Sequence, residues 1–380
     1  MPKSVQSVAF VSTMDGHNWG GSEELWSRTA VELCNRRFAV SASVVEWDKP
    51  HGNIRKMEDR GVNLWLRPQS YPFWKRGLQR VTRRGQSSSK IEVEKMLAAV
   101  KPSLVVLSAG APYPPADLME LCISKSIPFV TIGQANWEDN WVPDEYAGRC
   151  RNALASALRC YFVSIANLRL TEKQLGHKFT NAEVVRNPLN VEYDSAPSEP
   201  TNPILQMACV GRLNPPSKGQ DILFEALAQP IWLERDWQLN LFGEGPQKDV
   251  LVRLVKSLNL SHRVHFAGHK APFDIWCDHH VLVLPSRAEG LPLAMVEAML
   301  CGRPVVATNV AGHAEIMIHG KTGFLADAPT PASVSAALEL FWANREHWQQ
   351  LGRADAARAR ELVPRDPIGV FAKKIMALIS

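Results

Sequence analysis

The chain has 380 residues, of which 46% are hydrophobic and 21% are charged. This composition is typical of a globular protein, and at roughly 100–200 residues per domain the length predicts two domains. The formal net charge of +5 is too small and too dispersed to indicate nucleic acid as the main partner. No run approaches the roughly 18 apolar residues of a membrane-spanning helix, and the N-terminal apolar run is too short for a signal peptide.

Seven cysteines are spread along the chain, without a CxxC pair or the Cys/His spacing of a metal site. An odd count without such spacing favours reduced cysteines in a cytoplasmic protein over a disulfide framework. We therefore expect a cytoplasmic location, no metal site and no resident cofactor.

The first half of the chain alternates short apolar strands with helical patterns. The strand SVAFVST (7–13) precedes a helix over 22–37 that has one apolar face. Further strands are expected in VSASVVEW, VNLWL, SLVVLS, PFVTIG, CYFVS and AEVVRN. Short strands that alternate with helices predict a parallel sheet covered on both faces.

A polar, proline-bearing stretch over 193–203 interrupts this alternation and is interpreted as a linker. The alternation then restarts, with strands expected in ILQMACVG, WQLNLFG, VHFAG, HVLVLPS, RPVVAT and TGFLA. We therefore predict an α/β chain of two doubly wound Rossmann-like lobes, residues 1–195 and 203–366. Ligands of such sheets bind at the carboxyl ends of the strands.

The turn after the first strand contains Gly20 and Gly21, which let the backbone approach a ligand closely because they lack Cβ. Ser22 is a suitable N-cap for the helix that follows. Glycines before a helix N-terminus are typical of an anion site, although a tight turn alone would give the same pattern.

Two cations follow the first strand of the second lobe, in VGRLNPPSKG. Arg212 leaves the strand end, and Lys218 lies just before a helix. At the carboxyl edge of a sheet such a pair is suited to clamp a diphosphate; the alternative is two solvated surface charges. In LFGEGPQ, Gly243 serves either backbone geometry alone or space for a ligand.

Two carboxylates frame a loop-to-helix turn in EGLPLAMVE. Glu289 is placed in the loop, and Glu297 is placed on a helix from about Leu291 to Leu300. The amides of Gly290, Leu291 and Leu293 would point out of the helix start. Main-chain amides at a helix start bind anions such as phosphate, and carboxylates accept hydrogen bonds from hydroxyls. A site that offers both suits a sugar nucleotide.

This stretch resembles the E-x7-E motif of retaining glycosyltransferases of the GT-B fold, glycosyltransferase family 4. The resemblance extends through VGRLNPPSKG, LFGEGP, AGH, the stretch from PSRAEG to KTGFL, and NWGGSEELW. It is dense from about 204 to 327 and thinner in the first half. It implies two lobes that face each other across a cleft. It also implies a C-terminal helix over 367–380 that crosses back to the first lobe.

The resemblance also implies a role for each matching residue. Arg212 and Lys218 would hold the donor diphosphate and stabilise the leaving group. Glu289 would bind donor-sugar hydroxyls, Glu297 the ribose, and Gly21 would approach the phosphates. The implied reaction moves a sugar from a nucleotide-diphosphate sugar to an acceptor with retention of configuration, and it needs no metal.

One position departs from the family pattern. The family carries a histidine after a first-lobe strand, whereas this chain has PFVTIG followed by Gln134. Glutamine does not titrate but still donates to and accepts from a hydroxyl, so we expect Gln134 to contact substrate at the donor-sugar end of the cleft. His17, Asn136, Glu138 and Asp139 are further polar candidates near this end of the lobe.

A basic stretch over 74–85 has two readings: a contact with an anionic acceptor or with the cytoplasmic membrane surface, or a solvated face. The acceptor itself is left open between a sugar, a lipid-linked molecule and a small molecule. Two other functions also stay open: a nucleotide-sugar hydrolase or epimerase of the same fold, and a non-catalytic nucleotide-sugar binding protein.

Overall fold

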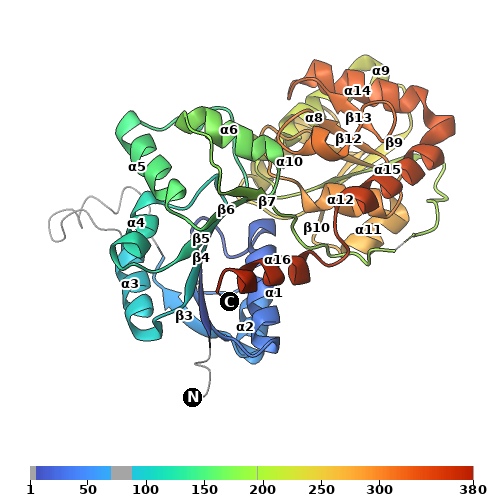
Figure 1. The fold of residues 1–380 in the computed structure, drawn as a ribbon. Helices are drawn as coiled ribbons and strands as arrows, with labels where there is room; N and C mark the ends of the chain where they lie inside the picture. The colour runs from blue at the N-terminus through green and yellow to red at the C-terminus, as the bar shows by residue number, and fades with distance from the viewer. Residues whose placement is uncertain (1–5, 70–87, 195, 380) are drawn as a thin grey trace. The chain divides into compact units, whose positions relative to one another are not determined.

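The computed structural model describes residues 6–69, 88–194 and 196–379. The chain divides into two compact units: unit 1 is Met1–Pro188 with Asp366–Ser380, and unit 2 is Leu189–Arg365 (Figure 1). The predicted basic stretch 74–85 lies outside the described residues.

Unit 1 is built on a parallel seven-stranded sheet. Its strand order is β3-β2-β1-β4-β5-β6-β7, and every neighbouring pair is parallel. The strands are β1 (Ser7–Ser12), β2 (Ala39–Val45), β3 (Asn63–Arg67), β4 (Leu104–Ala109), β5 (Phe129–Gly133), β6 (Arg159–Phe162) and β7 (Ala182–Val184). The helices are α1 (Gly21–Asn35), α2 (Gly52–Asp59), α3 (Ser88–Val100), α4 (Ala116–Ser124), α5 (Asp144–Ala155), α6 (Ile165–Leu175) and α16 (Pro367–Ala377).

Helices cover both faces of this sheet, because its central strands are apolar on both sides. Along β1, Ala9 and Val11 belong to one hydrophobic cluster, and Val8 and Phe10 belong to another. All four side chains are fully buried. Successive side chains of a strand point to opposite faces, so β1 contributes to two hydrophobic cores, one on each face of the sheet. The continuous apolar runs predicted a sheet that is buried on both faces.

Unit 2 repeats the design with a six-stranded sheet in the order β10-β9-β8-β11-β12-β13, again parallel throughout. The strands are β8 (Leu205–Val210), β9 (Trp237–Phe242), β10 (Val264–Gly268), β11 (Val281–Leu284), β12 (Val305–Thr308) and β13 (Phe324–Ala326). The helices are α7 (Pro215–Lys218), α8 (Gln220–Leu227), α9 (Pro230–Leu233), α10 (Lys248–Ser257), α11 (Pro272–Asp278), α12 (Leu293–Leu300), α13 (His313–Ile316), α14 (Pro331–Ala343), the 3-10 turn η1 (Arg345–His347) and α15 (Trp348–Leu362).

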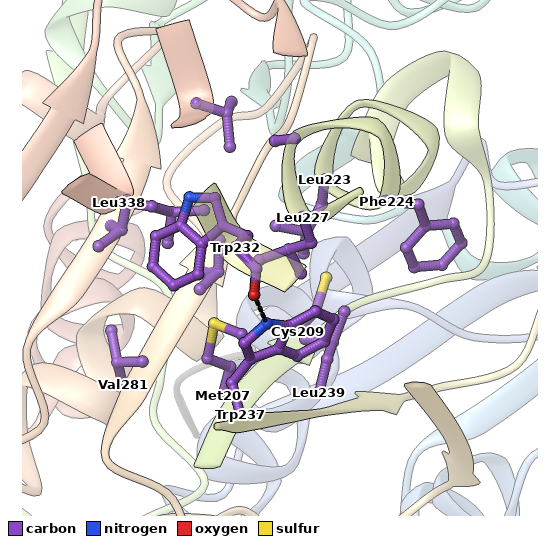
Figure 2. Close-up of a cluster of buried hydrophobic side chains, with 14 of the residues drawn as sticks. Met207, Cys209, Leu223, Phe224, Leu227, Trp232, Trp237, Leu239, Val281 and Leu338 are labelled. Carbon is purple, nitrogen blue, oxygen red and sulfur yellow. Dashed lines mark hydrogen bonds between the residues drawn. The ribbon is translucent and has the colours of Figure 1, made fainter. Parts of the chain in front are cut away.

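Two tryptophans anchor one core of unit 2. Trp232 and Trp237 are 0% and 1% exposed, and Figure 2 shows them among aliphatic side chains from α8, β8 and β9. The Trp237 Nε1 donates to the Trp232 carbonyl at 2.7 Å, which satisfies its polar atom inside an apolar cluster. This contact joins the short helix α9 to β9.

The stretch predicted as a linker packs on unit 2 instead. The Tyr193 hydroxyl contacts the carbonyls of Arg360 and Val363, at 2.7 and 3.0 Å. The guanidinium of Arg303, 1% exposed, donates to the carbonyls of Pro197 and Ser198. Because these main-chain groups are bound by unit 2, the division falls at Pro188 and Leu189, before the polar stretch begins.

The C-terminal helix α16 belongs to unit 1 and packs on α1 (Figure 1). Phe371 is 1% exposed. Its ring packs edge-on against the Tyr161 ring, with the two ring centroids 5.1 Å apart. Lys374 forms an ion pair with Glu183. Val370, the residue before Phe371 on this helix, is 41% exposed.

We predict that Phe371→Ala destabilises unit 1 by about 3–5 kcal/mol, because it removes a buried ring and leaves a cavity. Val370→Ala, one position away on the same helix, should change stability by less than about 0.5 kcal/mol. Urea unfolding followed by tryptophan fluorescence measures both. Equal effects of the two substitutions would contradict the packing of α16.

Candidate functional site

The strand order of unit 2 reverses between β8 and β11, and their two loops meet there. The main-chain carbonyl of Ser217 accepts hydrogen bonds from the main-chain N–H groups of Arg287 and Ala288, at 2.8 and 3.1 Å. Gly219 is left-handed (φ +65°), and a Cβ on it would lie 2.0 Å from the Pro285 carbonyl oxygen. Only glycine permits this approach, so the loops form one surface at the reversal, where open α/β sheets bind ligands.

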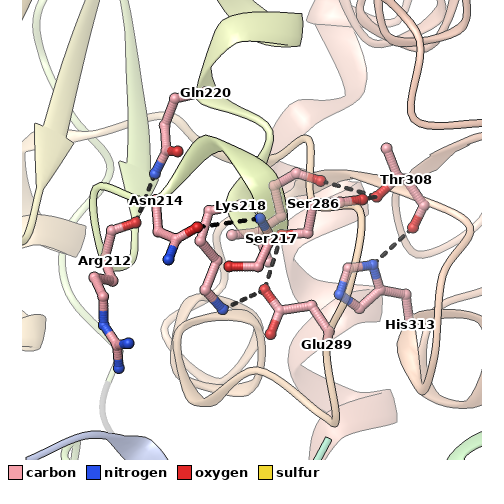
Figure 3. Close-up of polar contacts among 10 residues, drawn as sticks. Arg212, Asn214, Ser217, Lys218, Gln220, Ser286, Glu289, Thr308 and His313 are labelled. Carbon is pink, nitrogen blue, oxygen red and sulfur yellow. Dashed lines mark hydrogen bonds and ion pairs between the residues drawn. The ribbon is translucent and has the colours of Figure 1, made fainter. Parts of the chain in front are cut away.

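An ion pair joins these loops. The Lys218 Nζ lies 2.6 Å from Glu289 Oε1, and the same oxygen accepts from Ser286 Oγ at 2.8 Å. The Lys218 side chain is 26% exposed and that of Glu289 is 7% exposed. Figure 3 shows the ammonium and the carboxylate turned towards each other. A cation that reaches the surface is thus held by a nearly buried anion, a geometry in which Coulomb attraction is weakly screened.

Arg287 holds the two loops in place. Its guanidinium forms two hydrogen bonds with Asp221, both at 2.7 Å, and donates to the Pro215 carbonyl at 2.8 Å. A bidentate pair of this kind fixes orientation as well as distance. The sequence carries no signal for this role of Arg287, because its partner Asp221 lies 66 positions earlier in the chain.

Arg212 belongs to the same edge but does not join the ion pair. Figure 3 shows its side chain extending without turning towards Lys218 and Glu289. Its carbonyl accepts from Gln220 Nε2 at 2.8 Å, and burial lowers the pKa of its guanidinium. Gly243 has φ +135°, and a Cβ there would lie 2.2 Å from the Gly211 carbonyl oxygen. This close approach accounts for Gly243 through backbone geometry.

Glu297 lies on α12 and is 3% exposed. Its Oε1 accepts from the main-chain N and the Nδ2 of Asn190, at 3.0 and 3.1 Å. The helix begins at Leu293, two residues later than predicted, because Pro292 is extended (ψ 129°) and acts as the N-cap. Gly290 and Leu291 therefore lie in the preceding loop, and Leu293 carries the first helical amide.

A buried histidine, His313, lies beside the Lys218–Glu289 pair. His313 is 0% exposed, and its Nδ1 lies 2.7 Å from the Thr308 carbonyl, while its Nε2 has no partner. Burial lowers its pKa, against the opposing effect of the Glu289 charge. Thr308 Oγ1 in turn donates to the Ser286 carbonyl at 2.6 Å (Figure 3). His313 lies within the resemblance from PSRAEG to KTGFL, but no role was implied for it there.

In unit 1 the glycine turn leads directly into α1. The helix begins at Gly21 with extended Gly20 as its N-cap (φ −166°), so Ser22 lies in the first turn and is not the cap. Glu23 is 4% exposed. Its Oε2 accepts from Ser12 Oγ at 2.7 Å and Trp26 Nε1 at 3.0 Å. Desolvation raises the pKa of Glu23 to about 7, against the opposing effects of these bonds and of the Arg67 charge.

Gln134 immediately follows β5, at the carboxyl edge where it was expected. Its amide N–H is shared by the carbonyls of Ala109 and Ala111, each at 3.1 Å. Its Oε1 accepts from Asn187 Nδ2 at 2.8 Å. The side chain is buried, at 5% exposed, and its contact with a substrate stays a prediction.

The remaining polar candidates of unit 1 have structural partners or lie at the surface. Asn136 is 2% exposed, and its Nδ2 donates to Thr171 Oγ1 at 3.1 Å and Gln174 Oε1 at 2.9 Å. Glu138 is exposed and pairs loosely with Lys173 at 3.5 Å. Asp139 is exposed, and His17 is partly buried in the loop before the glycine turn.

Within residues 6–69, 88–194 and 196–379, no group of three or more His, Cys, Asp or Glu side chains is arranged to hold a metal ion. In the same part of the chain, every helix is too short or too polar to cross a membrane.

Part of unit 2 is similar in sequence to glycosyltransferases. Residues 205–344 match the family model described as Glycosyl transferases group 1. The chain is 35% identical over 142 residues to an uncharacterised glycosyltransferase of Methanocaldococcus jannaschii, covering 36% of this chain and 38% of that protein. It is 34% identical over 146 residues to the N-acetyl-alpha-D-glucosaminyl L-malate synthase of Bacillus anthracis, covering 38% of this chain and 36% of that enzyme. The matches span little more than a third of these relatives' length.

Structural comparison covers both units. The crystal structure of Anabaena HepE in complex with UDP-glucose matches with a TM-score of 0.73 at 20% identity, over 98% of this chain and 99% of that chain. The fold is GT-B. At this identity the likeness shows the architecture, and the GT-B fold accounts for two parallel sheets that both reverse their strand order beside the first strand.

In this GT-B chain, we predict that Glu23→Gln flattens the dependence of stability on pH. A folded-state pKa of about 7, above the ordinary 4.5, means that the native state holds the proton more tightly. The resulting stabilisation is present below pH 4.5 and is lost as the pH rises through 7. The parent should therefore lose roughly 3 kcal/mol over this window relative to the variant.

Urea unfolding at several pH values between 4.5 and 8 measures this slope. Glu138→Gln, at a side chain 78% exposed, is the matched control and should keep the slope of the parent. A Glu23→Gln protein with the slope of the parent would show that the buried carboxyl does not titrate in this window.

Proposed function

We propose that this chain is a glycosyltransferase that moves a sugar from a nucleotide-diphosphate sugar to an acceptor, with retention of configuration and without a metal ion. The observation that carries the proposal is the Lys218–Glu289 pair, 2.6 Å apart at the reversal point of the second sheet. It offers a cation for phosphate beside a carboxylate for sugar hydroxyls. Few ligands other than a sugar nucleotide need both at one place.

In the proposed reaction, Arg212 and Lys218 stabilise the negative charge that develops on the leaving nucleoside diphosphate. Preorganised charge of this kind is usually the largest catalytic contribution. Glu289 fixes the Lys218 ammonium through Oε1, which also accepts from Ser286. We assign its Oε2 to a hydroxyl of the transferred sugar.

We assign the ribose hydroxyls to Glu297, whose orientation is set by the two hydrogen bonds from Asn190. The amides of Gly290, Leu291 and Leu293 and the glycines of the first unit, Gly20 and Gly21, are assigned to the phosphates. Helix N-termini and glycine turns bind anions through their main-chain N–H groups.

The comparisons support the donor class. HepE was crystallised with UDP-glucose, and the Bacillus anthracis relative is named for transfer of an N-acetylglucosaminyl group. We therefore take a UDP-hexose as the first donor to test. Retention and metal independence come from the sequence resemblance. The acceptor is a sugar, a lipid-linked molecule or a small molecule.

The function is tested by incubating the protein with UDP-, GDP- and ADP-sugars, with and without acceptor extracts, in the presence and absence of EDTA. Transfer requires the acceptor, whereas a hydrolase or epimerase consumes the donor alone and a binding protein releases no nucleotide. The configuration of the product is read by NMR. Inversion at the anomeric carbon, or loss of activity with EDTA, would contradict those parts of the proposal.

For the diphosphate clamp, we predict that Lys218→Ala weakens binding of UDP by roughly 10- to 100-fold and lowers turnover strongly, because a charge-assisted contact is worth about 1.5–3 kcal/mol. Calorimetry with UDP measures the affinity. Lys256→Ala, an exposed lysine on α10, is the control and should bind UDP like the parent. If the two variants bind UDP equally well, Lys218 does not contact the diphosphate.

A further inference from the structure

The buried histidine beside the charged pair of unit 2 has one unused ring nitrogen. His313 is the first residue of α13, and the main-chain N–H of Gly312 before it donates to the Gly290 carbonyl at 3.0 Å. This bond holds the histidine against the loop that carries Glu289. The ring is 0% exposed, and among the described residues its Nε2 has no hydrogen-bond partner. Buried polar atoms are nearly always satisfied, so this nitrogen needs an explanation.

The hydrogen bond at the other ring nitrogen limits what Nε2 can do. The His313 Nδ1 lies 2.7 Å from the Thr308 carbonyl. A carbonyl only accepts, so Nδ1 carries the proton of the neutral ring and Nε2 is an acceptor. Nε2 becomes a donor only when the ring takes a second proton and is positively charged. Figure 3 shows Nε2 on the side of the ring that faces Glu289, so a second proton would lie towards that carboxylate.

Two charges of opposite sign act on this ring. Burial lowers the pKa of His313 most, the Glu289 carboxylate raises it, and the Lys218 ammonium lowers it. Because the two charged atoms are only 2.6 Å apart, their effects on the ring largely cancel. Cys209 on β8 adjoins the same pair, but burial raises the pKa of its thiol to about 12 and it stays neutral. The protonation of His313 therefore depends on the balance between one cation and one anion.

A diphosphate bound at Lys218 would upset this balance. Each phosphate group of a nucleotide sugar carries a negative charge, and the ammonium would be shared between those groups and Glu289. The surroundings of His313 would then be net negative. Charges at a buried site are weakly screened, so the added negative charge favours the protonated ring.

We infer that binding of the donor diphosphate at Lys218 makes His313 take up a proton at Nε2. The proton comes from the solvent, and no other bond is formed or broken. The resulting imidazolium offsets the charge of the phosphates and donates towards Glu289. The inference rests on the proposed function through the Lys218 contact, and all three residues belong to unit 2.

This coupling fixes the sign of a pH effect on binding. The ring holds its proton more tightly in the complex than in the free protein, so the affinity for the donor is highest at low pH. The affinity is lost as the pH rises, because the ring must then gain a proton when the donor binds.

Calorimetry with UDP-glucose, in PIPES, HEPES and Tris buffers at the same pH, tests this inference. UDP-glucose is the suitable probe because it lacks the terminal phosphate of UDP, which would itself titrate with a pKa of about 6. The slope of the binding enthalpy against the ionisation enthalpy of the buffer gives the protons taken up. In the parent protein we expect proton uptake, and an affinity that falls roughly fivefold or more between pH 6 and pH 8.

His313→Asn identifies the group that takes the proton. Asparagine keeps an N–H donor for the Thr308 carbonyl but does not titrate. The variant should bind UDP-glucose without proton uptake, and its affinity should be the same at pH 6 and pH 8. His347→Asn, at an exposed histidine of η1, is the matched control and should keep the proton uptake of the parent.

Binding without proton uptake in the parent would overturn the inference and leave the proposed function standing. Uptake that persists in His313→Asn would assign the proton to another group, such as Glu23, and would also overturn it. Should His313→Asn fail to fold, ¹⁵N NMR of the histidine rings in the parent decides, because UDP-glucose must convert one ring from the singly to the doubly protonated form. A parent that binds none of UDP-, GDP- and ADP-glucose would overturn the proposed function first, and this inference with it.

Discussion

Parallel strands impose the constraint on which every candidate residue depends. In a parallel sheet all carboxyl ends lie on one edge, so the loops that follow different strands are brought together there whatever their separation in the chain. Lys218 follows β8 and Glu289 follows β11, 71 positions apart, yet their charged atoms lie 2.6 Å apart. Gln134 and Asn187, 53 positions apart, meet in the same way in the first sheet.

The loops of unit 2 can form their charged contacts only because glycines let their backbones approach each other closely. Gly219 lets the loop after β8 reach the Pro285 carbonyl, and Gly243 lets the loop after β9 reach the Gly211 carbonyl. A side chain at either position would force the loops apart and would separate the groups that the charged pair needs. Arg287 then locks the arrangement through Asp221 and the Pro215 carbonyl. The glycines and this arginine are thus positioning elements for Lys218 and Glu289.

Buried polar groups are used differently in the two units. In unit 2 the Lys218–Glu289 pair is partly exposed on the cationic side, which suits an anionic ligand that arrives from solvent. In unit 1, Glu23, Gln134 and Asn187 are almost fully buried. Burial raises the pKa of Glu23 into the neutral range, whereas an amide pair keeps its hydrogen-bonding pattern at any pH.

The sequence by itself determined the α/β class, the two parallel sheets and most strand positions, because fully buried parallel strands appear as short apolar runs between helical patterns. It also pointed to Arg212, Lys218, Glu289 and Gln134, because each follows such a run, and to Glu297, because it is the second carboxylate of EGLPLAMVE. It predicted a linker over 193–203, whereas the structure divides the chain at Pro188 and Leu189. A polar stretch looks the same whether it links two units or is bound by one of them, as it is here through Arg303 and the carbonyls of Arg360 and Val363. Only the tertiary structure decided the partners: Ser286 and Lys218 for Glu289, Asn190 for Glu297, and Asn187 for Gln134. Strand order and loop packing choose these partners, and both depend on contacts between residues far apart in the chain.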